Sequence, residues 1–270
     1  MSRLAHALGY TLRSNRKRLS RKRNPNRDRQ MRYIARQRRA FEKAGDPVIS
    51  VDAKKKELIG PFKNSGRTLR RQPLDVLETD FPSDAEGQAR LYGIYDPQRN
   101  AGYMVVGVSH ETAEFAVAAI RRWWIEVGRI YYRNRTHLLI QADGGGANRA
   151  NGWLWKTELQ ALADEFNLTL TVTHFPPGAS KWNLIEHRMF GPISLNWAGQ
   201  PLVSYETVLK FIRTTRTETG FQCQARLDTA IYETGLKITA AEKAQLNLQP
   251  HRVFPEWNYT IRPRDPISKK

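Results

Sequence analysis

The sequence predicts a mixed α/β fold in which helices flank a β-sheet. Three observations support this prediction: short β-branched or aromatic runs, segments in which apolar residues recur every three or four positions, and the alternation of the two along the chain. The runs indicate strands, the wider spacing indicates helices, and their alternation favours a sheet covered by helices. With 270 residues, 40% of them hydrophobic, the chain is long enough to bury a large core.

The N-terminal half begins with a predicted helix and a buried strand. The helix starts at Asp28 and ends before Gly45, because a glycine after the last periodic residue stops a helix. The apolar run 47–51 predicts a buried strand with Asp52 at its exit. Residues 63–89 are rich in glycine, proline and charge, which indicates a long surface excursion.

A hairpin and a second acid come next. Residues 91–96 and 103–109 are rich in aromatic and β-branched side chains and are separated by turn-forming residues, so they predict two paired strands. Residues 112–127 have helical periodicity up to the glycine that follows them. The strand predicted over 137–140 runs into Asp143 and a glycine-rich turn, which again places an acid at a strand exit.

The C-terminal half supplies a third acid. The spacing of apolar residues predicts a helix over 155–166 and a strand from Leu168. Glu186 lies near the start of the next helix, beside its buried apolar positions. Residues 204–214 predict a further helix, and a capping box at Thr239 opens another.

The basic charge is concentrated at the N-terminus. The formal net charge of +18 predicts a polyanionic partner, and residues 1–46, with 15 basic and three acidic side chains, hold 12 of these charges. The stretch 13–29 is nearly free of apolar side chains, so we interpret it as an arm that orders on double-stranded DNA. A solvated basic tail or a targeting signal is the alternative. The DNA-contacting residues that we predict in the arm are Arg16, Lys17, Arg18, Arg21, Lys22 and Arg23.

The composition excludes several classes of protein. Cys223 is the only cysteine, which excludes an internal disulfide and a cysteine-rich zinc site and favours a reducing compartment. The sequence has no apolar run of about 18 residues, and its first residues lack the apolar stretch of a signal peptide. We therefore expect a cytoplasmic protein with no membrane partner.

Asp52, Asp143 and Glu186 are the candidate metal ligands. Two acids at the ends of neighbouring strands and one on an adjoining helix can converge, and carboxylate oxygens are the ligands that Mg²⁺ prefers. In phosphoryl transfer on nucleic acids, two such ions about 4 Å apart hold the attacking and leaving oxygens. Singly, an Asp before a glycine turn usually just ends a strand, and a Glu in a first helical turn usually complements the helix dipole. Their joint occurrence in so basic a chain favours a catalytic site.

Six long and unusual stretches lie between Val48 and Pro263. They read VISVDAKKKELIGPFKN, LYGIYD, ETAEFAVAAIRRWW, LLIQADGGGANR, VTHFPPGASKWNLIEHRMF and EWNYTIRP. These stretches resemble the Rhodopirellula-type DDE transposases of bacterial insertion sequences. The resemblance implies a ribonuclease-H-like fold in which Asp52, Asp143 and Glu186 form the catalytic trio and bind two Mg²⁺ or Mn²⁺ ions.

The resemblance also implies a reaction on double-stranded DNA. Water hydrolyses the phosphodiester at a transposon end, and the freed 3′-hydroxyl then attacks target DNA with the help of the same metal pair. It further implies a bacterial protein that associates with the nucleoid when bound to DNA and self-associates on paired transposon ends.

Polar residues near the trio are candidates for supporting roles. Asn183 lies one turn from Glu186 and can steady it or a nearby water molecule. His187 either assists the trio or packs in the core, and we expect packing. By position, four lysines can contact scissile or flanking phosphates, with plain surface polarity as the alternative; they are Lys54, Lys55, Lys56 and Lys181.

We divide the chain into two parts. Residues 1–46 form a basic N-terminal extension, and residues 47–270 form the catalytic domain with C-terminal helical or irregular additions. The transposases that the sequence resembles carry a substantial helix-turn-helix region before the core, whereas residues 1–17 resemble only its last helix. We therefore interpret the extension as a shortened DNA-binding region and expect little specific recognition of transposon ends.

Two other functions compete with a transposase core. A non-catalytic DNA-binding remnant or regulator would keep the fold, but the intact trio favours an enzyme. A metal-dependent nuclease without strand transfer would use the same carboxylates, so the sequence does not distinguish it from a transposase.

Overall fold

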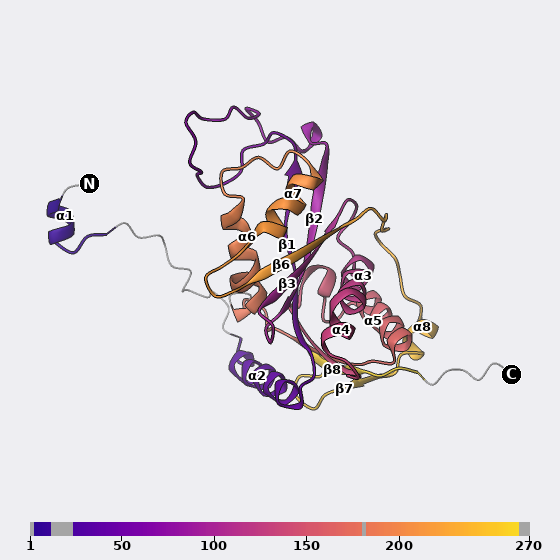
Figure 1. Ribbon diagram of the computed structural model, residues 1–270. Helices are drawn as coiled ribbons and strands as arrows, with labels where there is room; N and C mark the ends of the chain where they lie inside the picture. Colours follow the sequence, from indigo (N-terminus) through magenta and orange to yellow (C-terminus); the bar gives the residue numbers. More distant parts are fainter. Residues whose placement is uncertain (1–2, 12–23, 180–181, 265–270) are drawn as a thin grey trace.

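The computed structural model describes residues 3–11, 24–179 and 182–264, and its centre is an eight-stranded mixed sheet (Figure 1). The strand order across the sheet is β6-β3-β2-β1-β4-β5-β8-β7. The strands are β1 (Val48–Ile59), β2 (Gly87–Asp96), β3 (Ala101–Gly107), β4 (His137–Ala142), β5 (Thr169–His174), β6 (Gln222–Asp228), β7 (Leu248–Pro250) and β8 (Asn258–Ile261).

The five central strands have the ribonuclease-H-like arrangement that the resemblance implies. β3, β2 and β1 form an antiparallel meander. β4 and β5 then continue the sheet on the other side of β1, each parallel to its neighbour. The carboxyl ends of β4 and β5 therefore lie side by side at one end of the sheet. β1 extends beyond this end, and its fifth residue, Asp52, is the first that does not pair with β4.

Helices cover both faces of the sheet, so the fold has three layers. Figure 1 shows α3 and α5 on one side, and α2, α6 and α7 on the other. None of the helices in the described ranges has the length and apolar character that a membrane crossing requires. The helices are α1 (Arg3–Ala7), α2 (Arg27–Ala44), α3 (Ala113–Trp123), α4 (Arg129–Tyr131), α5 (Trp153–Phe166), α6 (Gly191–Asn196), α7 (Tyr205–Thr214) and α8 (Ala240–Ala244), with π-helical turns at Trp124–Gly128 and Glu186–Phe190.

The two faces of the sheet bury separate cores. On the α3 and α5 face, aromatic residues such as Tyr92, Trp123 and Trp155 pack with the aliphatic residues of β4 and β5. On the other face, Ile185 and Met189 pack with β2, β3 and α7. Alternate residues of each strand thus serve different cores, as the two-residue period of a strand requires.

Helix α2 packs on the sheet, although its residues belong to the predicted N-terminal extension. Ile34 contacts Phe175 in a small buried cluster. Gln30 is fully buried, and its amide donates to the carbonyl oxygen of His174 (2.9 Å) and to the side chain of Asn258 (2.8 Å). A buried amide with both partners satisfied fixes the position of the helix.

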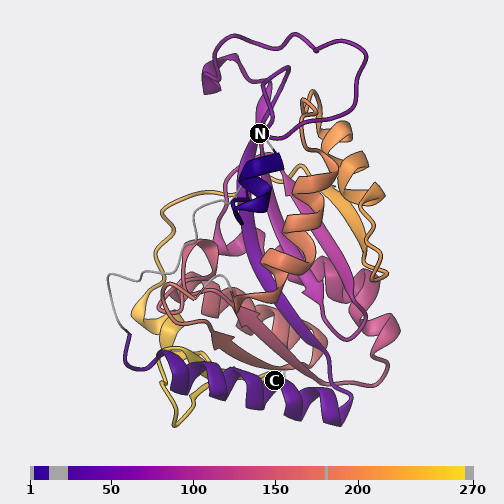
Figure 2. The same ribbon diagram turned by 90° about the vertical axis from the view of Figure 1, so that its left-hand side faces the viewer.

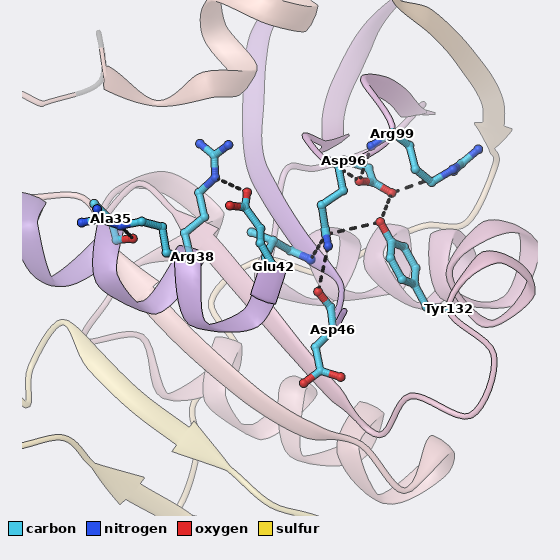
Figure 3. Close-up of polar contacts among 10 residues, drawn as sticks. Ala35, Arg38, Glu42, Asp46, Asp96, Arg99 and Tyr132 are labelled. Atoms are coloured by element: carbon cyan, nitrogen blue, oxygen red, sulfur yellow. Dashed lines mark hydrogen bonds and ion pairs between the residues drawn. The ribbon is translucent and has the colours of Figure 1, made fainter. Parts of the chain in front are cut away.

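The turn between β2 and β3 is tied to the start of β1. The side chain of Gln98 donates to the carbonyl oxygen of Asp46 (3.1 Å) and accepts from the amide of Val48 (3.0 Å). Tyr132, which follows α4, donates to the buried carboxylate of Asp96 at 2.8 Å (Figure 3). These bonds hold the amino end of β1 in place next to the C-terminus of α2.

The structure corrects two predicted boundaries. Asp52 lies inside β1 and not at its exit, because β4 pairs with β1 only as far as Val51, whereas β2 pairs with β1 beyond that point. The helix expected to stop at Gly128 continues through a π-helical turn into α4. Gly128 serves packing instead, since a Cβ there would collide with the ring of Trp124.

Candidate active site

Asp52 is buried in the middle layer of the fold. It lies at the point where β1 leaves β4, and its side chain is 7% exposed. One carboxylate oxygen accepts from the amide of Ala53 (2.8 Å), and the other accepts from the side chain of Asn183 (3.1 Å). Asn183 in turn accepts a short hydrogen bond from the hydroxyl of Ser50. The Asp52 carboxylate is therefore held by a buried chain of hydrogen bonds.

Asp143 has a comparable support. It follows β4 directly, and one of its oxygens accepts from the amide of Gly145 (3.2 Å). A hydrogen bond from the side chain of Asn148 also stabilises its ionised form. Asn148 is buried and accepts from the hydroxyl of buried Tyr92 (2.6 Å). Each aspartate thus has an asparagine donor that is fixed by a hydroxyl.

Glu186 belongs to the helical segment that packs against the sheet next to Asp52. It begins the π-helical turn that leads into α6, while Ile185 and Phe190 of the same segment pack against the sheet. Gly93 is directly opposite Asp52 on β2, and a Cβ at this position would clash with both of those apolar side chains. The missing side chain therefore lets the helix bring Glu186 close to Asp52.

The three carboxyl groups repel one another. Burial, followed by the charges of Asp143 and Glu186, raises the pKa of Asp52 to about 8. Burial also raises the pKa of Asp143. The pKa of Glu186 is raised by burial and by the charge of Asp143, against the opposing effects of His187 and Lys54. The three groups are therefore near enough for their charges to influence one another.

The chemistry of this group fits a hard divalent cation. All three side chains offer carboxylate oxygens, and none of them has an ion-pair partner within 4 Å among the described residues. As placed, however, no three acidic, histidine or cysteine side chains in the described ranges are close enough together to form a metal site. The convergence of the trio on one ion therefore stays a prediction.

The predicted phosphate contacts divide into two groups. Lys54 is largely buried, with its ammonium 2.8 Å from the carboxylate of Glu57 and 4.6 Å from the ring centre of Trp197. Lys55 and Lys56 are exposed, in a β-bulge where the register of β1 shifts against β2. Their contact with DNA stays a prediction. The remaining candidates lie outside the described residues: Arg16, Lys17, Arg18, Arg21, Lys22, Arg23 and Lys181.

The structure changes the interpretation of the two supporting residues. Asn183 donates to Asp52 and not to Glu186. His187, which we expected to be packed, is exposed, because it lies on the outer side of the π-helical turn while Met189 fills the core. Its charge lowers the pKa of Glu186. The expectation of packing was therefore wrong.

Sequence reasoning missed four residues that shape the site. They are Ser50, Tyr92, Gly93 and Asn148. The strand alternation places Ser50 and Asp52 on one face, which was a usable signal. The other three act through contacts across the sheet, and no spacing rule identifies such contacts.

The comparison with known families decides the identity of the domain. A model described as the Rhodopirellula transposase DDE domain matches residues 1–263, nearly the whole chain. The chain belongs to this family. As a DDE domain of the transposase type, it has the ribonuclease-H-like sheet that its sequence predicted. The family match begins at residue 1 and therefore also covers residues 1–46, ahead of the six stretches that carry the resemblance.

Solved structures similar to this DDE domain include complexes of Mos1 transposase. The pre-cleavage Mos1 transpososome shares 14% identity at a TM-score of 0.49, with 77% of this chain and 59% of that chain covered. The Mos1 paired-end complex with left transposon end also shares 14% identity, at a TM-score of 0.46 and with the same coverage. The DDE domain thus spans about three-fifths of the chains that it matches. No curated protein matches the chain.

Proposed function

We propose that this chain is the catalytic core of a transposase that cleaves double-stranded DNA at transposon ends and joins those ends to target DNA. Asp52, Asp143 and Glu186 would hold two Mg²⁺ or Mn²⁺ ions. When bound, these ions would supply positive charge to the attacking and leaving oxygens of the phosphodiester exchange. Membership in the DDE family supports the proposal.

The observation that carries the proposal is the mutual repulsion of the three carboxyl groups. A buried acid whose pKa is raised to about 8 by burial and by two other acids weakens the fold unless a cation offsets the repulsion. The protein nevertheless fixes both aspartates by hydrogen bonds to buried asparagines. Such support is typical of ligands whose positions must be maintained before metal and substrate arrive.

The residues of the chain have separate tasks in this proposal. Asn183 and Asn148 keep the two aspartates in a fixed orientation, so that little reorganisation accompanies the reaction. The exposed Lys55 and Lys56 are placed on the strand that carries Asp52, where they can hold flanking phosphates. We propose that the active form is a homo-oligomer on paired transposon ends.

The test is an assay of labelled duplex that carries defined transposon ends, incubated with Mg²⁺ and a supercoiled target. We expect nicks at the ends and end-to-target joints in the wild type, and neither product with Asp143→Asn, which should still bind the duplex. Asp228→Asn is the control, because Asp228 is a buried aspartate at a strand end but outside the trio. Nicks without joints would indicate a nuclease, whereas unchanged cleavage by Asp143→Asn would exclude the catalytic role.

A further inference from the structure

We propose that one face of α2 binds the phosphate backbone of the duplex that runs into the active site. The face consists of Arg29, Arg32, Arg36 and Arg39, and we call it the arginine face. The inference rests on the proposed action on DNA, but it concerns a surface that contains none of the carboxylates.

The arginine face is a continuous exposed stripe. Its four residues are spaced by three or four positions, so they fall within about 80° of the helix circumference and extend over about 15 Å. All four side chains are exposed, and Lys43, also exposed, continues the stripe by one turn. The opposite side of α2 is buried against the sheet through Gln30 and Ile34.

Within the described residues, the charges of this stripe have no acidic partner. None of the four arginines has a carboxylate within 4 Å there. Elsewhere on α2 the pairing is different: Arg38 lies 2.6 Å from the carboxylate of Glu42 (Figure 3), and Arg27 lies 3.6 Å from that of Asp28. Both acids of the helix therefore pair with arginines that lie outside the arginine face.

Aromatic rings hold two of the arginines in place. The guanidinium of Arg29 lies 5.2 Å from the ring centre of Phe254, and that of Arg36 lies 5.1 Å from the ring centre of Tyr33. The four arginines, Tyr33 and Val253 line an open hollow of about 590 Å³. A stacked guanidinium keeps its charge and its donors but has fewer conformations to lose on binding an anion.

The N-terminal end of α2 is connected to the active site. Gln30 donates to the carbonyl oxygen of His174, whose ring bonds to the carbonyl oxygen of Asp143 (2.9 Å). The guanidinium of Arg27 lies 5.4 Å from the ring centre of Trp182, and Trp182 directly precedes Asn183 in the sequence. Figure 2 shows α2 crossing the lower part of the sheet, on the side that also carries α6. A DNA duplex bound along the arginine face would thereby be directed towards the carboxylates of the trio.

Duplex DNA has the charge density that this stripe requires. Each strand of B-DNA carries one phosphate per 3.4 Å of axis, so a stripe of about 15 Å faces about four phosphates of one strand. Because guanidinium groups bind phosphate oxygens without reading bases, the arginine face would fix the path of the duplex and not its sequence. An acidic protein partner would instead leave DNA binding independent of these arginines.

The first test measures binding to a duplex of about 30 base pairs by anisotropy, over a salt series and without divalent metal, so that no cleavage occurs. For Arg32→Glu/Arg36→Glu we expect at least about tenfold weaker binding and a slope of log K against log salt that is flatter by about 2. Arg129→Glu/Arg133→Glu is the control, with the same change in charge on exposed residues at the amino end of β4. Equal effects of the two double variants, or no effect of the first, would overturn the proposal.

The second test maps the contact on the DNA. Cys223 is buried, and burial raises the pKa of its thiol, so a cysteine introduced at a surface position can be labelled selectively. Arg36→Cys carrying a photoactivatable cross-linker should attach to the duplex, and Arg133→Cys should not. Equal cross-linking from positions 36 and 133, or none from position 36, would contradict the arginine face. Failure of cleavage alone would bear only on the proposed function.

Discussion

The carboxylate site, formed by Asp52, Asp143 and Glu186, and the arginine face differ in the sign of their charge and in their exposure to water. The carboxylates of Asp52 and Asp143 are largely withdrawn from water, and each is fixed by an asparagine that is itself fixed by a hydroxyl. The four arginines of the arginine face are exposed, and within the described residues no carboxylate pairs with them. One region confines like charges at short range, whereas the other presents like charges at intervals of a helical turn.

This difference teaches which region is sensitive to single changes. Buried charges interact strongly, and their effect on a reaction depends on exact placement, so one substitution should have a large effect. Exposed charges are screened by salt and contribute to binding in small, nearly equal increments. The following predictions test this contrast.

The largest effect is expected from Asp52→Asn. Cleavage should fall by about a thousandfold or more, because the substitution removes the carboxylate at the centre of the trio. In the absence of metal the same change should stabilise the fold by about 1 kcal/mol, since it removes a buried charge that two other acids repel. Denaturation with and without Mg²⁺ measures both consequences. Mg²⁺ should stabilise the wild type and the control Asp228→Asn more than it stabilises Asp52→Asn. Equal stabilisation of all three proteins would show that Asp52 does not bind the metal.

The central fold was predictable because it depends on local signals. Apolar spacing and turn residues identified β1, β2, β3, β4 and β5 and the helices between them. The strands β6, β7 and β8 were not predicted. β7 and β8 have only three and four residues, and both are defined mainly by their pairing with distant segments.

The supports of the site were less accessible to sequence reasoning. The bond between Tyr92 and Asn148 joins residues that are 56 positions apart, and the bond between Asp52 and Asn183 spans 131 positions. Such partners are determined by the packing of the sheet, which no local pattern encodes. The position of Asp52 inside β1 was likewise hidden, because three lysines follow Ala53 and resemble a loop, although Lys54 pairs with β2 and the pairing resumes at Glu57.

A smaller effect is expected when the asparagine supports are removed. Asn183→Ala and Asn148→Ala should each weaken Mg²⁺ affinity by about tenfold to a hundredfold, because the aspartates lose their fixed orientation. Each change should also lower the free energy of unfolding by about 1 to 3 kcal/mol through the unsatisfied partners left behind. Calorimetric titration and denaturation measure the two quantities.

The control for the asparagines is Gln160→Ala. Gln160 is a buried amide with its own partners, Asp164 and the carbonyl oxygen of Arg262, away from the carboxylates. It should reproduce the loss of stability without the loss of Mg²⁺ affinity. If all three alanine variants bind Mg²⁺ as tightly as the wild type, the asparagines are structural residues only.

The smallest effect concerns the docking of α2, and therefore the position of the arginine face. The hydroxyl of Tyr33 accepts from Gln37 (2.9 Å) and shares a hydrogen bond with Nδ1 of His251 (2.6 Å), and Nε2 of the same ring shares one with the hydroxyl of Thr260 (2.8 Å). The neutral ring, which donates at one nitrogen and accepts at the other, can make both bonds. Burial, with a contribution from the charge of Arg262, lowers the pKa of His251 below its ordinary value.

A depressed pKa in the folded state means that this stabilisation is complete above the unfolded pKa of about 6.5 and is lost as the pH falls below it. Hydrogen exchange of the α2 amides should therefore become faster, relative to the rest of the sheet, between pH 7.5 and pH 5.5. This range lies above the region where His174 titrates, because burial lowers the pKa of that ring to about 4. In His251→Gln the amide can keep both hydrogen bonds and does not titrate, so the difference between the two pH values should disappear. An equal pH effect in this variant would show that a group other than His251 controls the docking of α2 at low pH.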